Sequence, residues 1–126
     1  MENEHNMHKD SWAGLALQDY KEGLGVFNER YPNLVASFNH FTEECFKADE
    51  LDAKTKQLIA LAIGVFANDE YCIIYHTKGA LDQGASEAEI LEAVGVAAAL
   101  GGGTAMAQGV TLVQDAVQEL QRGNIH

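Results

Sequence analysis

The sequence predicts an all-α protein of about six helices that forms a single domain over residues 1–126. The chain is 47% apolar, which is enough for one hydrophobic core in a chain of this length. It contains a single proline and many alanine, leucine, glutamate and glutamine residues, which favour helices. It has no alternating apolar and polar run bounded by turn residues, which is the pattern of a strand.

The first 48 residues predict a flexible polar tail over residues 1–10, followed by two helices. Ser11 is the expected N-cap of the first helix, which should end near Pro32 because proline interrupts a helix. The second helix is expected over about 33–48. Its apolar residues recur at helical spacing: Leu34, Phe38, Phe41, Cys45 and Ala48. Cys45 lies on this face and is therefore predicted to be a buried structural residue.

The middle of the chain predicts two central helices. The third helix should start near Asp52 and is apolar on nearly every side beyond Gln57, so we expect it to be contacted all round. Gln57 lies at the polar entrance to this core. Asn68 and Asp69 break the pattern and cap a fourth helix, which should end near Gly84.

The last third predicts two further helices. Ser86 and Glu89 have the spacing of a capping box at the start of the fifth helix, which closes at the three glycines of 101–103. The last helix is expected from Thr104 to about Gln121. The triple glycine does not predict a phosphate-binding loop, because no strand precedes it and no lysine follows it.

Charge and composition exclude several classes of partner. The formal net charge of −11 argues against binding of nucleic acid or of an anionic membrane. The longest uncharged stretch, 93–114, is rich in glycine and alanine, so no membrane-spanning helix is expected. The two cysteines lie 27 positions apart, which fits a reducing cytoplasm better than a disulfide framework. His5 and His8, in the tail, are too few for a metal site, and we expect no metal or other cofactor.

The stretch 69–76 holds a cysteine and a histidine four residues apart. In a helix that begins at Asp69 or Glu70, Cys72 and His76 lie one turn apart on one face and could share a proton. The helix terminus favours a thiolate, whereas the two acidic neighbours favour the neutral thiol. These effects nearly cancel, so the expected pKa of Cys72 is near the ordinary value of about 8.5. The alternative interpretation is that both residues simply belong to the core.

Three segments, taken together, resemble the carboxymuconolactone decarboxylase and alkylhydroperoxidase D-like superfamily. They are 54–62, 70–78, and 84–90 followed by the triple glycine, and the resemblance covers about 51–117. It implies an all-helical fold that assembles into trimers or hexamers. In the hydroperoxidase branch it also implies a CxxC pair, a histidine four residues after the second cysteine, and a glutamate on the preceding helix.

Two of these four groups are replaced in this sequence. Cys72 and His76 match the second cysteine and the histidine, whereas Asp69 stands at the first cysteine and Gln57 at the glutamate. Asp69 cannot form a disulfide, so the dithiol cycle of the family is unavailable. Gln57 can orient water or His76, but it cannot accept and release a proton as a carboxylate does.

Three functions follow as expectations. The first is thiol-dependent, peroxiredoxin-type reduction of a small peroxide, an antioxidant activity. In it Cys72 is the nucleophile, His76 moves the proton, Gln57 positions water or substrate, and an external thiol is the reductant. The second is a decarboxylase or isomerase of a small lactone acid with His76 as general acid and base. The third is a non-catalytic binding or assembly protein.

Overall fold

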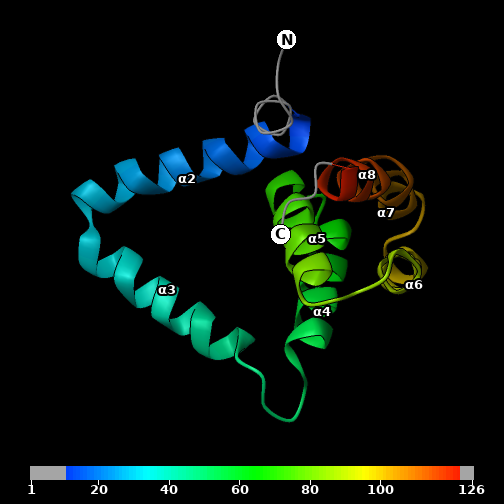
Figure 1. The fold of residues 1–126 in the computed structure, drawn as a ribbon, viewed down its shortest axis with the longest axis horizontal. Helices are drawn as coiled ribbons and strands as arrows, with labels where there is room; N and C mark the ends of the chain where they lie inside the picture. The colour runs from blue at the N-terminus through cyan, green and yellow to red at the C-terminus, as the bar shows by residue number, and fades with distance from the viewer. Residues whose placement is uncertain (1–10, 123–126) are drawn as a thin grey trace.

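The computed structural model describes residues 11–122, and all regular secondary structure in that range is helical. The helices are α2 (Trp12–Arg30), α3 (Pro32–Phe46), α4 (Ala53–Phe66), α5 (Glu70–Asp82), α6 (Glu87–Gly101), α7 (Gly103–Gln108), the π-helical turn η1 (Gly109–Val113) and α8 (Gln114–Arg122). Because α7, η1 and α8 run on as one helix, the described chain has six (Figure 1). The all-α prediction is confirmed.

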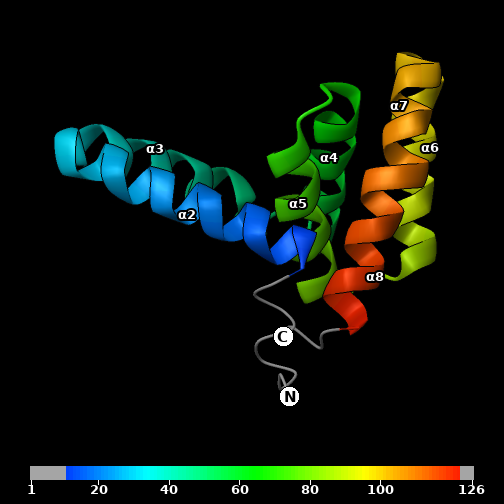
Figure 2. The same cartoon turned by 90° about the horizontal axis from the view of Figure 1, so that it is seen from above.

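The helices form a bundle and an arm. The bundle consists of α4, α5, α6 and the α7–α8 helix, which pack together. The arm consists of α2 and α3, a hairpin whose tip points away from the bundle (Figures 1 and 2). The bundle core contains fully buried side chains from α4, α5, α6 and η1: Leu61, Val65, Ile73, Ile90 and Val113. A smaller cluster joins the start of α2 to α5 and α8: Ala13, Ala16, Ile74, Ala116 and Leu120.

Local capping chemistry sets the helix starts, as the sequence predicted. The Ser11 hydroxyl accepts a hydrogen bond from the Gly14 amide at 3.0 Å, and Asp52 Oδ1 accepts from the Thr55 amide at 2.7 Å. These bonds satisfy amides that have no carbonyl partner in the first turn of a helix. Pro32 occupies the first position of α3, where its missing N–H costs nothing.

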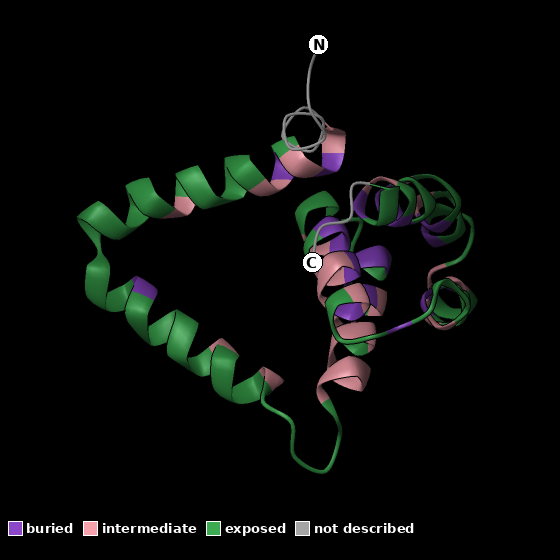
Figure 3. Cartoon of the chain, viewed as in Figure 1, coloured by how far each residue is buried: buried purple, intermediate pink, exposed green. Residues whose placement is uncertain are grey.

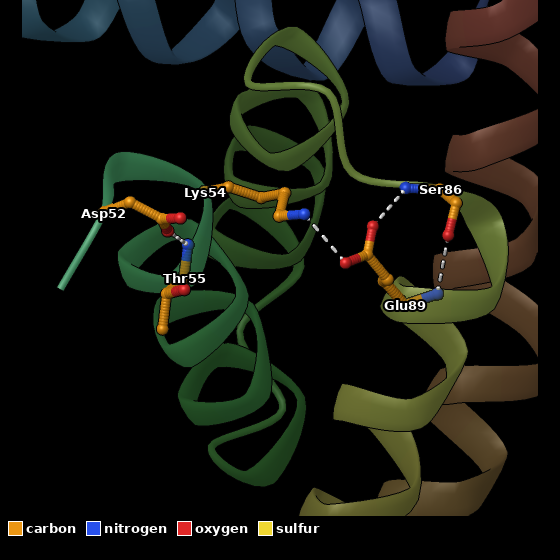
Figure 4. A network of polar contacts seen from close by, with 5 residues as sticks. All are labelled: Asp52, Lys54, Thr55, Ser86 and Glu89. Atoms are coloured by element: carbon orange, nitrogen blue, oxygen red, sulfur yellow. Dashed lines mark hydrogen bonds and ion pairs between the residues drawn. The ribbon is translucent and has the colours of Figure 1, made fainter.

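The predicted capping box also links two helices of the bundle (Figure 4). Glu89 Oε1 accepts from the Ser86 amide at 2.9 Å, and the Ser86 hydroxyl accepts from the Glu89 amide at 3.1 Å. Glu89 Oε2 also accepts from Lys54 Nζ at 2.9 Å. This hydrogen-bonded ion pair lowers the pKa of Glu89 and raises that of Lys54. The first turns of α4 and α6 are thereby held together.

Two predictions about burial are wrong. Cys45, predicted to be buried, is exposed, because the arm projects from the bundle and Val35 is the only buried residue of α3 (Figure 3). α4 is also not contacted all round, since Ile63 and Phe66 are 62% and 54% exposed. In both cases the sequence marks an apolar face, but no other part of the described chain covers it.

The π-helical turn was not predicted. It begins at Gly109, where α6 and η1 approach so closely that a Cβ would overlap Val94 Cγ1. Within residues 11–122 no helix is long and apolar enough to cross a membrane. The predicted tail over 1–10, with His5 and His8, lies outside the described residues.

Candidate functional site

The candidate site lies on the hairpin of α4 and α5. The connection between them turns at Asn68, whose φ of 57° is left-handed, and the Asp69 amide donates back to the Gly64 carbonyl at 3.0 Å. Gly64 allows the two helices to approach closely beside Cys72: a Cβ at residue 64 would lie 3.1 Å from Cys72 Cβ. Cys72 is therefore seated directly against α4.

Two acidic residues at the start of α5 have different partners. Asp69 is the N-cap, and its Oδ1 accepts a hydrogen bond from the Cys72 amide at 3.1 Å. Glu70 Oε1 instead accepts from the Trp12 indole at 2.7 Å, which docks the start of α2 onto α5. The predicted cap at Asp69 is confirmed, and it brings a carboxylate next to the thiol.

His76 is held by residues from three helices. Its Nδ1 lies 2.9 Å from Oε1 of Gln57 on α4. Its ring stacks on Phe46, the last residue of α3, with the centroids 5.4 Å apart and an angle of 9° between the planes. On α5, Tyr75 meets the same ring edge-on, with centroids 5.2 Å apart at 86°. The imidazole is therefore fixed in orientation.

The Gln57 contact determines which nitrogen of His76 is free. An amide oxygen can only accept a hydrogen bond, so the neutral imidazole carries its hydrogen on Nδ1 and donates it to Gln57 Oε1. Nε2 then keeps its lone pair. A neutral imidazole with this arrangement is a positioned general base at Nε2.

The surroundings of Cys72 and His76 favour the neutral form of each side chain. Burial raises the pKa of the Cys72 thiol, and the charge and hydrogen bond of Asp69 raise it further. Burial also lowers the pKa of His76, while the charge of Asp69 acts in the opposite direction. Relative to the expected near-ordinary value, the pKa of the thiol is therefore raised. The amide of Cys72 is engaged by Asp69, and no hydrogen bond joins the thiol to His76 among the contacts of residues 11–122.

The four predicted site residues form two separate hydrogen-bonded pairs. Gln57 binds His76, and Asp69 binds the backbone of Cys72. Sequence reasoning missed Phe46, which comes from a helix of the arm and has no signal in the local pattern. Within the described part of the chain, no group of three histidine, cysteine or acidic residues is placed to hold a metal ion.

A hollow of about 380 Å³ lies between α2 and the first turn of α5. It is lined by Asp19, Tyr20, Gly23, Leu24, Phe27 and Tyr71. Tyr20 packs against both Tyr71 and Tyr75, with centroids 6.4 and 6.2 Å apart. Neither Cys72 nor His76 lines this hollow, so it is not part of the site that those two residues form.

Residues 32–115 match the Carboxymuconolactone decarboxylase family, and the chain belongs to this family. A relative from Paracoccus denitrificans, "Uncharacterized protein 4 in cox locus", is 33% identical over 95 residues, which cover 75% of this chain and 86% of the relative. The family match over residues 32–115 includes the arm helix α3 as well as the α4–α5 hairpin.

Solved structures of the family share the fold. A carboxymuconolactone decarboxylase family protein from Legionella pneumophila superposes with a TM-score of 0.79 at 26% identity, over 90% of this chain and 97% of that one. A Thermotoga maritima protein of this family superposes with a TM-score of 0.65 at 28% identity, over 71% and 91% of the two chains. That protein is described as having a possible role in an antioxidative response.

Proposed function

We propose that this chain reduces small hydroperoxides through a single-cysteine thiol cycle at Cys72, assisted by His76. The observation that carries the proposal is the hydrogen bond between Gln57 Oε1 and His76 Nδ1. It leaves Nε2 free to accept a proton one helical turn after the half-buried thiol. The antioxidative role suggested for the Thermotoga maritima relative is consistent with this proposal.

The cycle needs one peroxide and two external thiols. The Cys72 sulfur attacks the distal oxygen of ROOH as its proton passes to His76 Nε2. The O–O bond breaks, the departing RO⁻ takes the proton from His76 and leaves as ROH, and Cys72 becomes a sulfenic acid. A first thiol displaces water and forms a mixed disulfide with Cys72; a second thiol releases a free disulfide and restores the Cys72 thiol.

Asp69 limits this activity in two ways. It cannot act as the resolving thiol, so the reductant must come from outside the chain, in a thiol-rich compartment such as the cytoplasm. Its charge and hydrogen bond also help keep Cys72 protonated, and the thiol reacts more slowly than the thiolate. The expected enzyme is therefore a slow peroxidase.

Peroxide consumption with dithiothreitol as reductant tests the proposal. Cys72→Ser should abolish turnover, and His76→Gln should reduce it because the proton acceptor is lost. Cys45→Ser is the matched control: it removes the other, exposed cysteine of α3 and should leave the rate unchanged. Full activity in Cys72→Ser would overturn the proposal.

A second candidate function is proton transfer on a small lactone acid, and the lowered pKa of His76 favours it as a neutral base that needs no thiolate. An acidic substrate would need a cation, however, and the lysines of α4 and α5 are all engaged. Lys54 pairs with Glu89, Lys78 pairs with Asp82 at 2.7 Å, and Lys56 donates to the Lys47 carbonyl at 2.6 Å. We therefore rank this function second.

Turnover of carboxymuconolactone distinguishes a peroxidase, an enzyme acting on a lactone acid and a non-catalytic protein. Conversion of this lactone by both wild type and Cys72→Ser, lost in His76→Gln, would favour the second function over the first. If neither the lactone nor a peroxide is turned over, the chain is a non-catalytic member of the family.

We also propose that copies of this chain assemble into a homo-oligomer, with a trimer or hexamer as the form implied by the family resemblance. The supporting observation is a row of apolar side chains on α3, Leu34, Phe38 and Phe41, each more than half exposed. A contiguous apolar surface of this kind is a sign of a protein–protein interface. Sedimentation velocity should give an oligomer that Phe41→Glu weakens. A compact monomer at micromolar concentration would contradict assembly.

A further inference from the structure

Gly79 lies on α5 one turn after His76, and the Gln57 carboxamide occupies the space where its side chain would be. A Cβ built on Gly79 would overlap Gln57 Oε1 and lie 3.0 Å from Nε2 of the same amide. The carboxamide that binds His76 therefore packs directly against the backbone of α5. No other residue type would leave this space open.

Six other helical glycines of the described chain have different neighbours. Gly23, Gly25 and Gly95 would meet nothing within 4 Å. Gly101 and Gly109 approach the side chains of the core, and Gly64 approaches Cys72. Glycine destabilises a helix interior relative to alanine, and at residue 79 the atoms that would be displaced belong to a polar group of the site.

We propose that Gly79 is a positioning residue: by leaving room for the Gln57 carboxamide it fixes the Nδ1–H tautomer of His76 and keeps Nε2 unprotonated. The catalytic consequence rests on the proposed function, because Nε2 is the proton acceptor of the peroxide cycle. The tautomer itself does not depend on any activity.

Gly79 acts on the tautomer of His76 through the Gln57 side chain, while Phe46 holds the imidazole ring. Gln57 is long and flexible, so its amide needs a defined seat to hold Oε1 at 2.9 Å from Nδ1. Phe46 fixes the plane of the imidazole by stacking on it. A methyl group at residue 79 would displace the end of the Gln57 side chain rather than a backbone atom. The fold should therefore survive, while His76 loses its acceptor at Nδ1 and can carry its hydrogen on Nε2.

Nitrogen NMR of the imidazole ring, recorded above the His76 pKa, tests this directly, with the signals assigned from His76→Gln. Wild type should show His76 with hydrogen on Nδ1. Gly79→Ala should shift most of the population to the Nε2–H form, and peroxide turnover should fall several-fold in kcat with little change in KM. The matched control is Gly95→Ala on α6, which should leave the tautomer unchanged because nothing lies within 4 Å of that position.

Two further variants distinguish a direct effect on the His76 tautomer from damage to the fold. Gln57→Asn keeps Gly79 and shortens the amide side chain, and it should produce the same tautomer change. In a Gln57→Ala background, Gly79→Ala should have no additional effect. An unchanged Nδ1–H signal in either Gly79→Ala or Gln57→Asn would overturn the inference. If the tautomer switches as expected but wild type consumes no peroxide, the positioning role stands and the proposed function fails.

Discussion

Replacing Asp69 by asparagine should make Cys72 more reactive. Asparagine caps a helix as well as aspartate does, so the substitution removes the charge next to the thiol and keeps an oxygen for the Cys72 amide. Two charges about 4 Å apart interact by about 4 kcal/mol at an effective dielectric constant of ~20. The site is partly open to solvent, which screens this energy, so we expect the pKa of the Cys72 thiol to fall by much less than the full interaction would give.

The alkylation rate of Cys72 should rise by less than its thiolate fraction does. Each unit by which a thiol pKa falls raises the thiolate fraction at pH 7 roughly tenfold. Intrinsic nucleophilicity falls with pKa, with a Brønsted coefficient of about 0.4–0.5, so alkylation should become only about three- to fourfold faster for each such unit. The pKa of Cys72 should remain above its usual value, because burial is the larger cause of its elevation.

Alkylation by iodoacetamide, measured against pH in a Cys45→Ser background, is the assay. Glu70→Gln is the matched control: its oxygen can still accept from the Trp12 indole, and its charge is not among the causes that raise the thiol pKa. An unchanged or slower rate in Asp69→Asn, or an equal gain in Glu70→Gln, would refute the assignment of Asp69.

Three further predictions concern the caps of α5 and α6 and the titration of His76. Asp69→Cys should form an intramolecular disulfide with Cys72 on oxidation, seen as a mass loss of two hydrogens, because the first turn of a helix brings the Cα atoms within the roughly 4.4–6.8 Å that a disulfide requires. Absence of that bond would mean that residue 69 is not the cap. Ser86→Ala should lower the free energy of unfolding in urea by about 1 kcal/mol, since it removes the hydroxyl that accepts from the Glu89 amide; no change would contradict the capping box. The pKa of His76 is lowered in the folded chain, so the unfolded chain binds more protons at this residue. The contribution of His76 to the free energy of unfolding should therefore be complete above about pH 6.5 and be lost as the pH drops towards the folded-state pKa. His76→Gln should reduce that fall, and an identical pH dependence would exclude His76 as its source.

The helix boundaries were predictable because they depend on local chemistry. Ser11, Asp52, Asp69 and Ser86 each cap a helix through a hydrogen bond within three residues. Such contacts form whatever the rest of the fold does. The exposure of Cys45 was not predictable, since an apolar spacing identifies a face but not the element that covers it.

The site was predictable only in part. Spacing and the family resemblance identified Cys72, His76 and Gln57. The ring of Phe46 reaches His76 only because α3 ends beside the bundle, and that depends on the path of the arm. The role of Gly79 depends on the packing of α5 against α4, so no sequence pattern reveals it. The raised pKa of Cys72 also follows from burial, which is a property of the folded chain.

We predict that peroxide oxidises Cys72 with the help of His76. Mass spectrometry of the Cys72 peptide, after treatment with hydrogen peroxide in the presence of dimedone, measures the sulfenic acid directly. The expected result is a dimedone adduct on Cys72 that forms at the same rate in wild type and Cys45→Ser, and more slowly in His76→Gln. Failure of wild type to form the adduct at Cys72, or an adduct confined to Cys45, would contradict the proposed oxidation of Cys72.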